Sequence, residues 1–113
     1  MSYSLGIRID GARIKDEDAR IIALLIYGLS YKIIGDIMDY EAKTVRNHVS
    51  KLYGDLELES EVNALLRKAH AYGFDFEGNC YSQSVLDKAD RARLERFAPQ
   101  VKKEKSLPTI IYA

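Results

Sequence analysis

The stretch KTVRNHVS, residues 43–50, is the strongest indication of how this chain folds. It lies within a predicted helix from about Ala42 to Leu56 whose two sides differ sharply in character, at 3.6 residues per turn. The residues of one side are apolar: Ala42, Val45, Val49, Leu52 and Leu56. Those nearly opposite are polar: Lys43, Arg46, Asn47 and Ser50. We therefore expect one face to pack on a core and the other to meet a ligand.

Another short helix is predicted directly before this one, running to about Met38. Gly28 can end the preceding helix, predicted over 16–27, because glycine adopts a left-handed backbone at little cost. Ser30 can then cap the new helix through its hydroxyl oxygen, and residues 39–41 form the turn that follows. Two short helices joined by a tight turn, the second with a polar outer face, are what a helix-turn-helix DNA-binding protein needs.

The flanking segments are predicted from their apolar patterns. Residues 5–9 alternate between apolar and other residues, which favours a short strand or an extended arm. A fourth helix is expected after Ser60, which would cap it, and should end at Gly73. Residues 74–82 look like a loop, and a fifth helix should follow from about Gln83 to Phe97, with Pro99 ending it.

Three parts of the chain follow from this pattern. Residues 1–13 form the N-terminal arm or short strand, 14–74 the helix-turn-helix domain and 75–113 a C-terminal extension with a helix and an apolar tail. We expect the tail, 109–112, to dock as a strand or extended segment, and the N-terminal alternating run is one candidate partner. The predicted fold class is mainly α, a four-helix bundle with an additional C-terminal helix and possible short terminal strands.

Composition places the chain among small cytoplasmic proteins. No apolar run reaches the roughly 18–20 residues of a membrane helix, and the N-terminus lacks the pattern of a signal peptide. Cys80 is the one cysteine, so no internal disulfide can form, which suits a reducing compartment. The 17 basic and 17 acidic residues give a formal net charge of zero, whereas DNA-binding domains are usually basic.

The charges are distributed unevenly along the chain. Residues 55–61 carry four acids and no base, whereas basic residues predominate in 84–105. In the fifth helix we favour a charged surface with intrahelical pairs such as Asp87 with Arg91. The alternative is that Lys88, Arg91, Arg93 and Arg96 make accessory contacts to phosphates.

Two sequence blocks in residues 14–74 resemble the LuxR-type (GerE-, FixJ- and NarL-like) DNA-binding domain. Residues 28–35, GLSYKIIG, match the family pattern Gly-Leu-Ser-x-Lys-x-Ile-Ala. Residues 43–50 match the segment of the recognition helix that contains Thr-Val-x-x-His. The resemblance implies a LuxR-type four-helix bundle, here with a short preceding segment and a C-terminal extension in place of a sensor domain.

The resemblance also implies which residues contact DNA. Its base-reading positions fall on Arg46, Asn47 and Ser50. Its phosphate-contacting positions fall on Lys32, Lys43, Thr44 and Lys51. The side-chain chemistry agrees, because arginine can bind the guanine edge and asparagine the adenine edge with two hydrogen bonds each, while lysine and threonine suit phosphates.

The family forms dimers through its last helix, and this implies a set of interface residues here: Val62, Leu65, Leu66, Ala69 and Tyr72. The chain departs from the family at both ends of the recognition helix. Glu41 replaces the opening serine, and residues 55–58, Asp-Leu-Glu-Leu, replace Lys-Leu-Gly-Val. These acids predict weaker or differently supported binding to the DNA backbone.

We therefore expect a sequence-specific transcriptional regulator, bacterial or from a phage or plasmid, that binds double-stranded DNA as a homodimer in the cytoplasm. The alternative is a protein-interaction module on the same scaffold, binding another regulator or RNA polymerase, which the net charge of zero and the acidic segment favour. The sequence shows no catalytic motif, and its two histidines and one cysteine form no metal-binding pattern. We accordingly expect no enzyme activity, no cofactor and no metal, and a packing or phosphate-adjacent role for His48.

Overall fold

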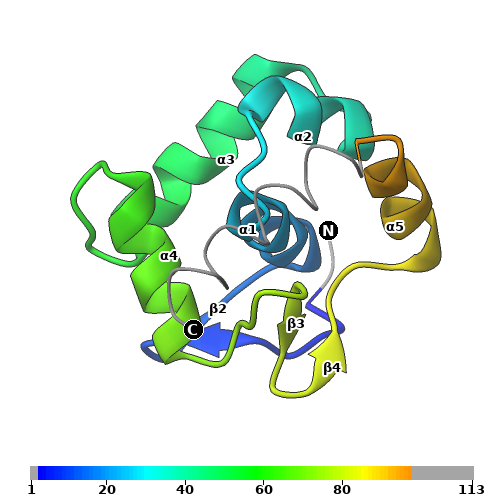
Figure 1. Ribbon diagram of the computed structural model, residues 1–113. Helices are drawn as coiled ribbons and strands as arrows, with labels where there is room; N and C mark the ends of the chain where they lie inside the picture. The colour runs from blue at the N-terminus through cyan, green and yellow to red at the C-terminus, as the bar shows by residue number, and fades with distance from the viewer. Residues whose placement is uncertain (1–2, 98–113) are drawn as a thin grey trace, which may run out of the picture.

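The computed structural model describes residues 3–97, which fold into five helices and two antiparallel strand pairs (Figure 1). The expectation of a mainly α protein is confirmed. In chain order the elements are β1 (Arg8–Ile9), β2 (Ala12–Arg13), α1 (Asp16–Ile26), α2 (Tyr31–Met38), α3 (Ala42–Asp55), α4 (Val62–Ala71), β3 (Asn79–Cys80), β4 (Gln83–Ser84) and α5 (Lys88–Glu95).

Helix α1 forms the centre of the molecule. Figure 1 shows it nearly end-on, with the other helices arranged around it. Its residues 21–24, Ile-Ile-Ala-Leu, are all fully buried, so this helix is covered on every side rather than along one stripe. A helical segment that is apolar all round belongs inside a core, and the other elements pack around this half of α1 for that reason.

The joints between the first three helices follow the sequence prediction. Gly28 has a φ of 81°, in the left-handed region that glycine tolerates. The Ser30 hydroxyl accepts a hydrogen bond from the amide of Ile33 at 3.3 Å and caps α2. Asp39 ends α2 with a left-handed backbone, and Glu41 begins α3 without a side-chain cap. A turn of residues 39–41 therefore links the two helices.

The predicted cap of the fourth helix is wrong. Helix α4 begins at Val62 with Glu61 in the capping position, and no side chain caps it. The amide of Leu65 instead bonds to the carbonyl of Glu61, as in an ordinary helical turn. Ser60 lies one residue too early to supply the cap.

Residues 74–84 differ from the prediction. A loop was predicted over 74–82 and a helix from Gln83, but the structure has a second strand pair there and α5 starts later. Strands β3 and β4 pair through a turn in which Tyr81 and Ser82 both have positive φ, as in the turns that suit tight hairpins. The helix begins only at Lys88, because Asp87 accepts a bond from the amide of Asp90 while Asp90 bonds back to the amide of Asp87.

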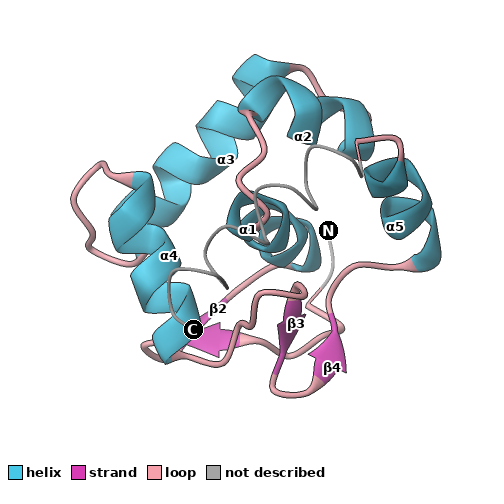
Figure 2. Ribbon diagram, in the orientation of Figure 1, coloured by secondary structure: helices cyan, strands magenta, loops and turns pink. Residues whose placement is uncertain are grey.

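Both strand pairs lie on the side of α1 opposite α2 and α3 (Figure 2). The expected N-terminal strand forms as β1, which pairs with β2 so that Ile9 lies opposite Ala12. The Tyr81 hydroxyl donates to the carbonyl of Arg8 at 2.7 Å, and the side-chain amide of Gln83 donates to the carbonyl of Leu5 at 2.9 Å. Segments from the two ends of the described chain thus lie side by side.

Two further predictions concern the apolar tail and membrane-spanning helices. The predicted docking of the apolar tail, 109–112, lies outside the described residues. No helix within residues 3–97 combines the length and the apolar character needed to cross a membrane.

Candidate nucleic-acid interface

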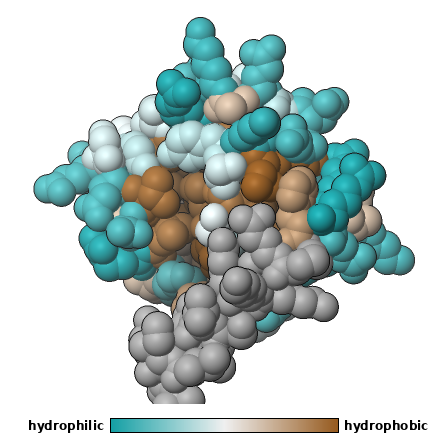
Figure 3. All heavy atoms as spheres, turned by 45° about the horizontal axis from the view of Figure 1, so that its top comes forward, coloured by the Kyte–Doolittle hydropathy of each residue, from teal (hydrophilic) through white to brown (hydrophobic). Residues whose placement is uncertain are grey.

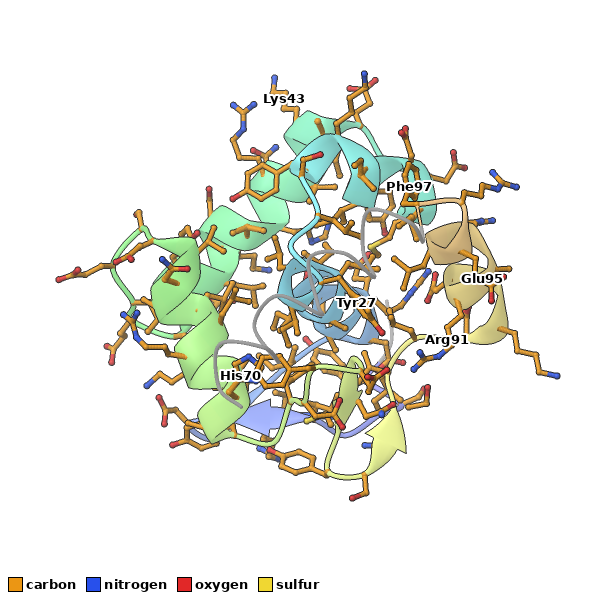
Figure 4. The ribbon with its side chains drawn as sticks, viewed as in Figure 1. Tyr27, Lys43, His70, Arg91, Glu95 and Phe97 are labelled. Carbon is orange, nitrogen blue, oxygen red and sulfur yellow. The ribbon has the colours of Figure 1, made fainter. Side chains whose placement is uncertain are left out.

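Helix α3 has a buried face and an exposed polar face, as its sequence predicts. Val45, Val49 and Leu52 are at most 2% exposed and belong to the core. Five polar side chains are exposed at spacings of three and four residues, which places them on one face of the helix: Lys43, Arg46, Asn47, Ser50 and Lys51. We call these five residues the α3 polar face. Lys43 points away from the body of the molecule (Figure 4).

The two remaining candidate contacts lie in the first turns of α2 and α3. Lys32 is exposed in the first turn of α2, and Thr44 is half-buried next to Lys43 in the first turn of α3. Glu41 and Asp55 are both exposed, so an acid stands at each end of α3. Figure 3 shows hydrophilic side chains along the upper edge and sides of one face of the molecule, and apolar side chains gathered mainly in its middle.

The turn before α3 packs closely against α2. The amide of Tyr40 donates to the carbonyl of Gly35 at 2.8 Å. A Cβ placed on Gly35 would lie only 2.4 Å from the carbonyl oxygen of Tyr40, which is far inside van der Waals contact. Glycine at position 35 therefore permits the close approach that sets the start of α3 relative to α2.

His48 connects α3 to the beginning of α1 rather than facing outward. Its Nδ1 lies 2.8 Å from Oδ1 of Asp18, and its ring stacks on Tyr40 with centroids 5.7 Å apart. The Tyr40 hydroxyl donates to Oε2 of Glu17 at 2.6 Å. Burial raises the pKa of Asp18, against the opposing effect of its bond to His48, and the bond to Glu17 together with burial raises the pKa of Tyr40 to about 12.

The expected packing role of His48 therefore fits the structure. Neither the contact of His48 with Asp18 nor that of Tyr40 with Glu17 is among the features predicted from the sequence. The contact between Asp18 and His48 joins segments 30 residues apart. A local sequence pattern therefore cannot predict it.

Helix α4 offers less of the expected dimer surface than its sequence predicts. Leu65 and Ala69 are fully buried within the chain, so assigning these two to a dimer interface needs correction. Val62 and Leu66 are half-buried and line an open apolar hollow with Leu25, Leu29 and Tyr31. The Tyr72 side chain is exposed, and its hydroxyl donates to Asp10, which also binds Lys68.

The arginines of α5 bind other parts of the chain instead of forming the expected pair with Asp87. Arg91 donates to Ser84 Oγ at 3.2 Å and to Asn79 Oδ1 at 3.4 Å, whereas Asp87 caps the helix. Arg93 donates to the carbonyl of Ile37 at 2.6 Å, at the end of α2. These two side chains hold the C-terminal part of the described chain against the rest, which leaves them poorly placed for phosphate contacts.

Comparisons of the chain with protein-family models, with curated proteins and with solved structures find no match. The resemblance to the LuxR-type domain therefore rests on its two sequence blocks, and the function has to be argued from the surface chemistry of α3.

Proposed function

We propose that this chain is a LuxR-type transcriptional regulator without enzyme activity, which binds double-stranded DNA in the cytoplasm as a small homodimer. In this proposal α3 enters the major groove, as the second helix of a helix-turn-helix protein does. The observation that carries it is the α3 polar face, which stands opposite a buried apolar face on the helix that follows a three-residue turn. An α-helix fits the width of the major groove and can bring such side chains to the base edges.

Within this face the residues divide by chemistry. Arg46 and Asn47 are suited to bidentate contacts with guanine and adenine, and Ser50 adds a weaker contact to either base. Lys43, Thr44 and Lys51 lie on the same helix and Lys32 lies on α2, and these four are suited to phosphates, which position the protein without reading sequence. The remaining candidates for a dimer surface are the half-buried Val62 and Leu66 on α4 and the exposed Tyr72 just after it.

Replacing Arg46 or Asn47 with alanine should remove sequence discrimination. Each good bidentate contact contributes about 1–3 kcal/mol of discrimination against a wrong base, or roughly 5- to 150-fold in affinity. The measurement is selection of a preferred duplex from a randomised pool, followed by titration of that duplex and a scrambled one with each variant. We expect each variant to bind the preferred duplex more weakly while its affinity for the scrambled one changes little.

Arg67→Ala is the matched control, because Arg67 is an exposed arginine that belongs to α4 and not to the α3 polar face. Lys51→Ala should weaken binding to both duplexes and lower the salt dependence by about one phosphate contact. If the unsubstituted protein, Arg46→Ala and Asn47→Ala bind every duplex equally, α3 does not read bases.

A protein-interaction module remains the second candidate, favoured by the acidic segment after α3. Its four acids are all exposed, and the whole chain has no net charge: Asp55, Glu57, Glu59 and Glu61. Salt separates the two functions, because DNA binding weakens steeply as salt rises. Retention of purified RNA polymerase at high salt, together with no DNA binding at low salt, would favour the interaction module.

A further inference from the structure

The first turn of α1 and the middle of α3 bring together one imidazole and two carboxylates, from Glu17, Asp18 and His48. Each residue offers a possible ligand atom, and these atoms all lie within 4.8 Å of one another. Asp18 is buried, while Glu17 and His48 are partly buried. The cluster thus has the residue types of a metal site and is largely shielded from solvent.

Glu17 provides the most informative atom of this cluster. Its Oε2 accepts the hydrogen bond from Tyr40, but its Oε1 is buried and finds no hydrogen-bond partner among the residues that the structure describes. Burying a carboxylate oxygen without a partner is unfavourable, and such atoms are rare in folded proteins. A cation beside Oε1 would supply the missing partner.

Tyr40 orients two of the three side chains at once. Its hydroxyl fixes the Glu17 carboxylate, and its ring stacks on His48 at an interplanar angle of 5°. Groups that hold the ligands in this way are characteristic of metal sites, because they set the direction of the donor atoms and reduce the entropy lost on binding.

We propose that Glu17, Asp18 and His48 form a binding site for a divalent transition metal, with Zn²⁺ as the ion that fits best. Zinc accepts a mixture of imidazole nitrogen and carboxylate oxygen, and three protein ligands leave one position for water. Magnesium and calcium prefer oxygen ligands alone, so His48 disfavours them. The ion would be coordinated by Nδ1 of His48 and by one oxygen of each carboxylate.

The charge of a divalent ion would be neutralised at this site, and the proton that it displaces has a place to go. Two carboxylates neutralise the two charges of the ion, and the imidazole binds in its neutral form. Any proton held between Nδ1 of His48 and Oδ1 of Asp18, now 2.8 Å apart, leaves to solvent. In a tetrahedral site with bonds of about 2.0–2.2 Å the donor atoms lie further apart than this, so the two side chains separate slightly when the ion enters.

The ion would link α1 directly to the helix that carries the α3 polar face. Residues 17 and 18 belong to the first turn of α1, and residue 48 lies in the middle of α3. Stabilising this contact would fix the orientation of α3 whether or not the chain binds DNA. The site therefore does not depend on the proposed function.

The test uses the full chain, stripped of metal with a chelator and titrated with Zn²⁺ near neutral pH. Calorimetry should show one ion bound per chain, and thermal unfolding should shift upward with added Zn²⁺ but not with Mg²⁺, since an ion that binds only the folded state stabilises it. Co²⁺ as a spectroscopic substitute should give visible absorption bands that Zn²⁺ removes. None of these three readouts requires DNA.

Glu17→Gln is the most informative variant because it preserves the size of the side chain and an oxygen that can accept from Tyr40. It should weaken Zn²⁺ binding by more than the roughly 10- to 100-fold that follows loss of a ligand's supporting partner. His48→Gln should do the same. Circular dichroism of each metal-free variant establishes that it is folded.

His70→Gln is the matched control, because the Nδ1 of His70 bonds to the carbonyl of Phe74 at the end of α4. Cys80 is unsuited to competing for the ion, since it is buried and burial raises the pKa of its thiol to about 11. Absence of Zn²⁺ binding, equal binding by Glu17→Gln and the unsubstituted chain, or loss of binding in His70→Gln would each overturn the proposal.

Discussion

Arg20→Ala is expected to lower the free energy of unfolding by up to about 3 kcal/mol, the low end of the cost of removing one partner of a buried ion pair, because the Arg20 side chain is 29% exposed. Asp90 is fully buried, and Arg20 donates to its two carboxylate oxygens at 2.8 and 2.5 Å. Without the guanidinium the carboxylate remains buried with only the amide of Asp87 as a donor from the α5 cap. Chemical denaturation of both proteins measures the difference.

The pair joins α1 to α5, so its loss should loosen the C-terminal part of the described chain first. Arg67→Ala is the control, because Arg67 is an exposed arginine and such surface substitutions usually change stability by less than about 0.5 kcal/mol. The double variant Arg20→Met, Asp90→Leu should recover much of the loss, since it leaves no buried charge. An Arg20→Ala protein as stable as the control would show that the pair contributes little.

Gly35→Ala is expected to destabilise the protein by about 1–3 kcal/mol, the usual cost of forcing an extra methyl into packed surroundings. The added Cβ would lie 2.4 Å from the carbonyl oxygen of Tyr40, and this neighbour is backbone rather than a flexible side chain. The turn between α2 and α3 must shift to make room.

Gly54→Ala provides the opposite result as a control. Gly54 lies in α3, and a Cβ there meets nothing within 4 Å. Alanine should stabilise the helix by about 0.5–1 kcal/mol, because it loses less backbone freedom on folding than glycine does. Thermal unfolding of the two variants should therefore shift in opposite directions. An equal shift in both would mean that the turn tolerates the methyl group.

The helices of residues 16–71 could be predicted because their signals are local. Apolar spacing of three and four residues, Gly28 between α1 and α2 and the Ser30 hydroxyl all act within one or two turns of the chain. The hairpin of β3 and β4 could not be predicted in this way. Its strands are two residues long, and Tyr81 and Ser82 adopt positive φ without being glycine.

The start of α5 shows how local signals can conflict. Val85 and Leu86 fall within the predicted helix from Gln83, and both are buried, but they lie in the non-helical segment before α5. The signal that decides the helix start is Asp87 with Asp90 three residues later, which form a reciprocal cap. This cap is a local signal, because its two residues lie within the first turn of the helix.

The sequence by itself determined the two faces of α3, since the periodicity of a helix follows from residues a few positions apart. Tertiary structure alone decided which side chains meet across the core. Arg20 and Asp90 are 70 residues apart, His48 and Asp18 are 30 apart, and Leu65 is buried only because other elements cover it. Burial and pairing of this kind depend on how distant segments pack, and no local pattern encodes that packing.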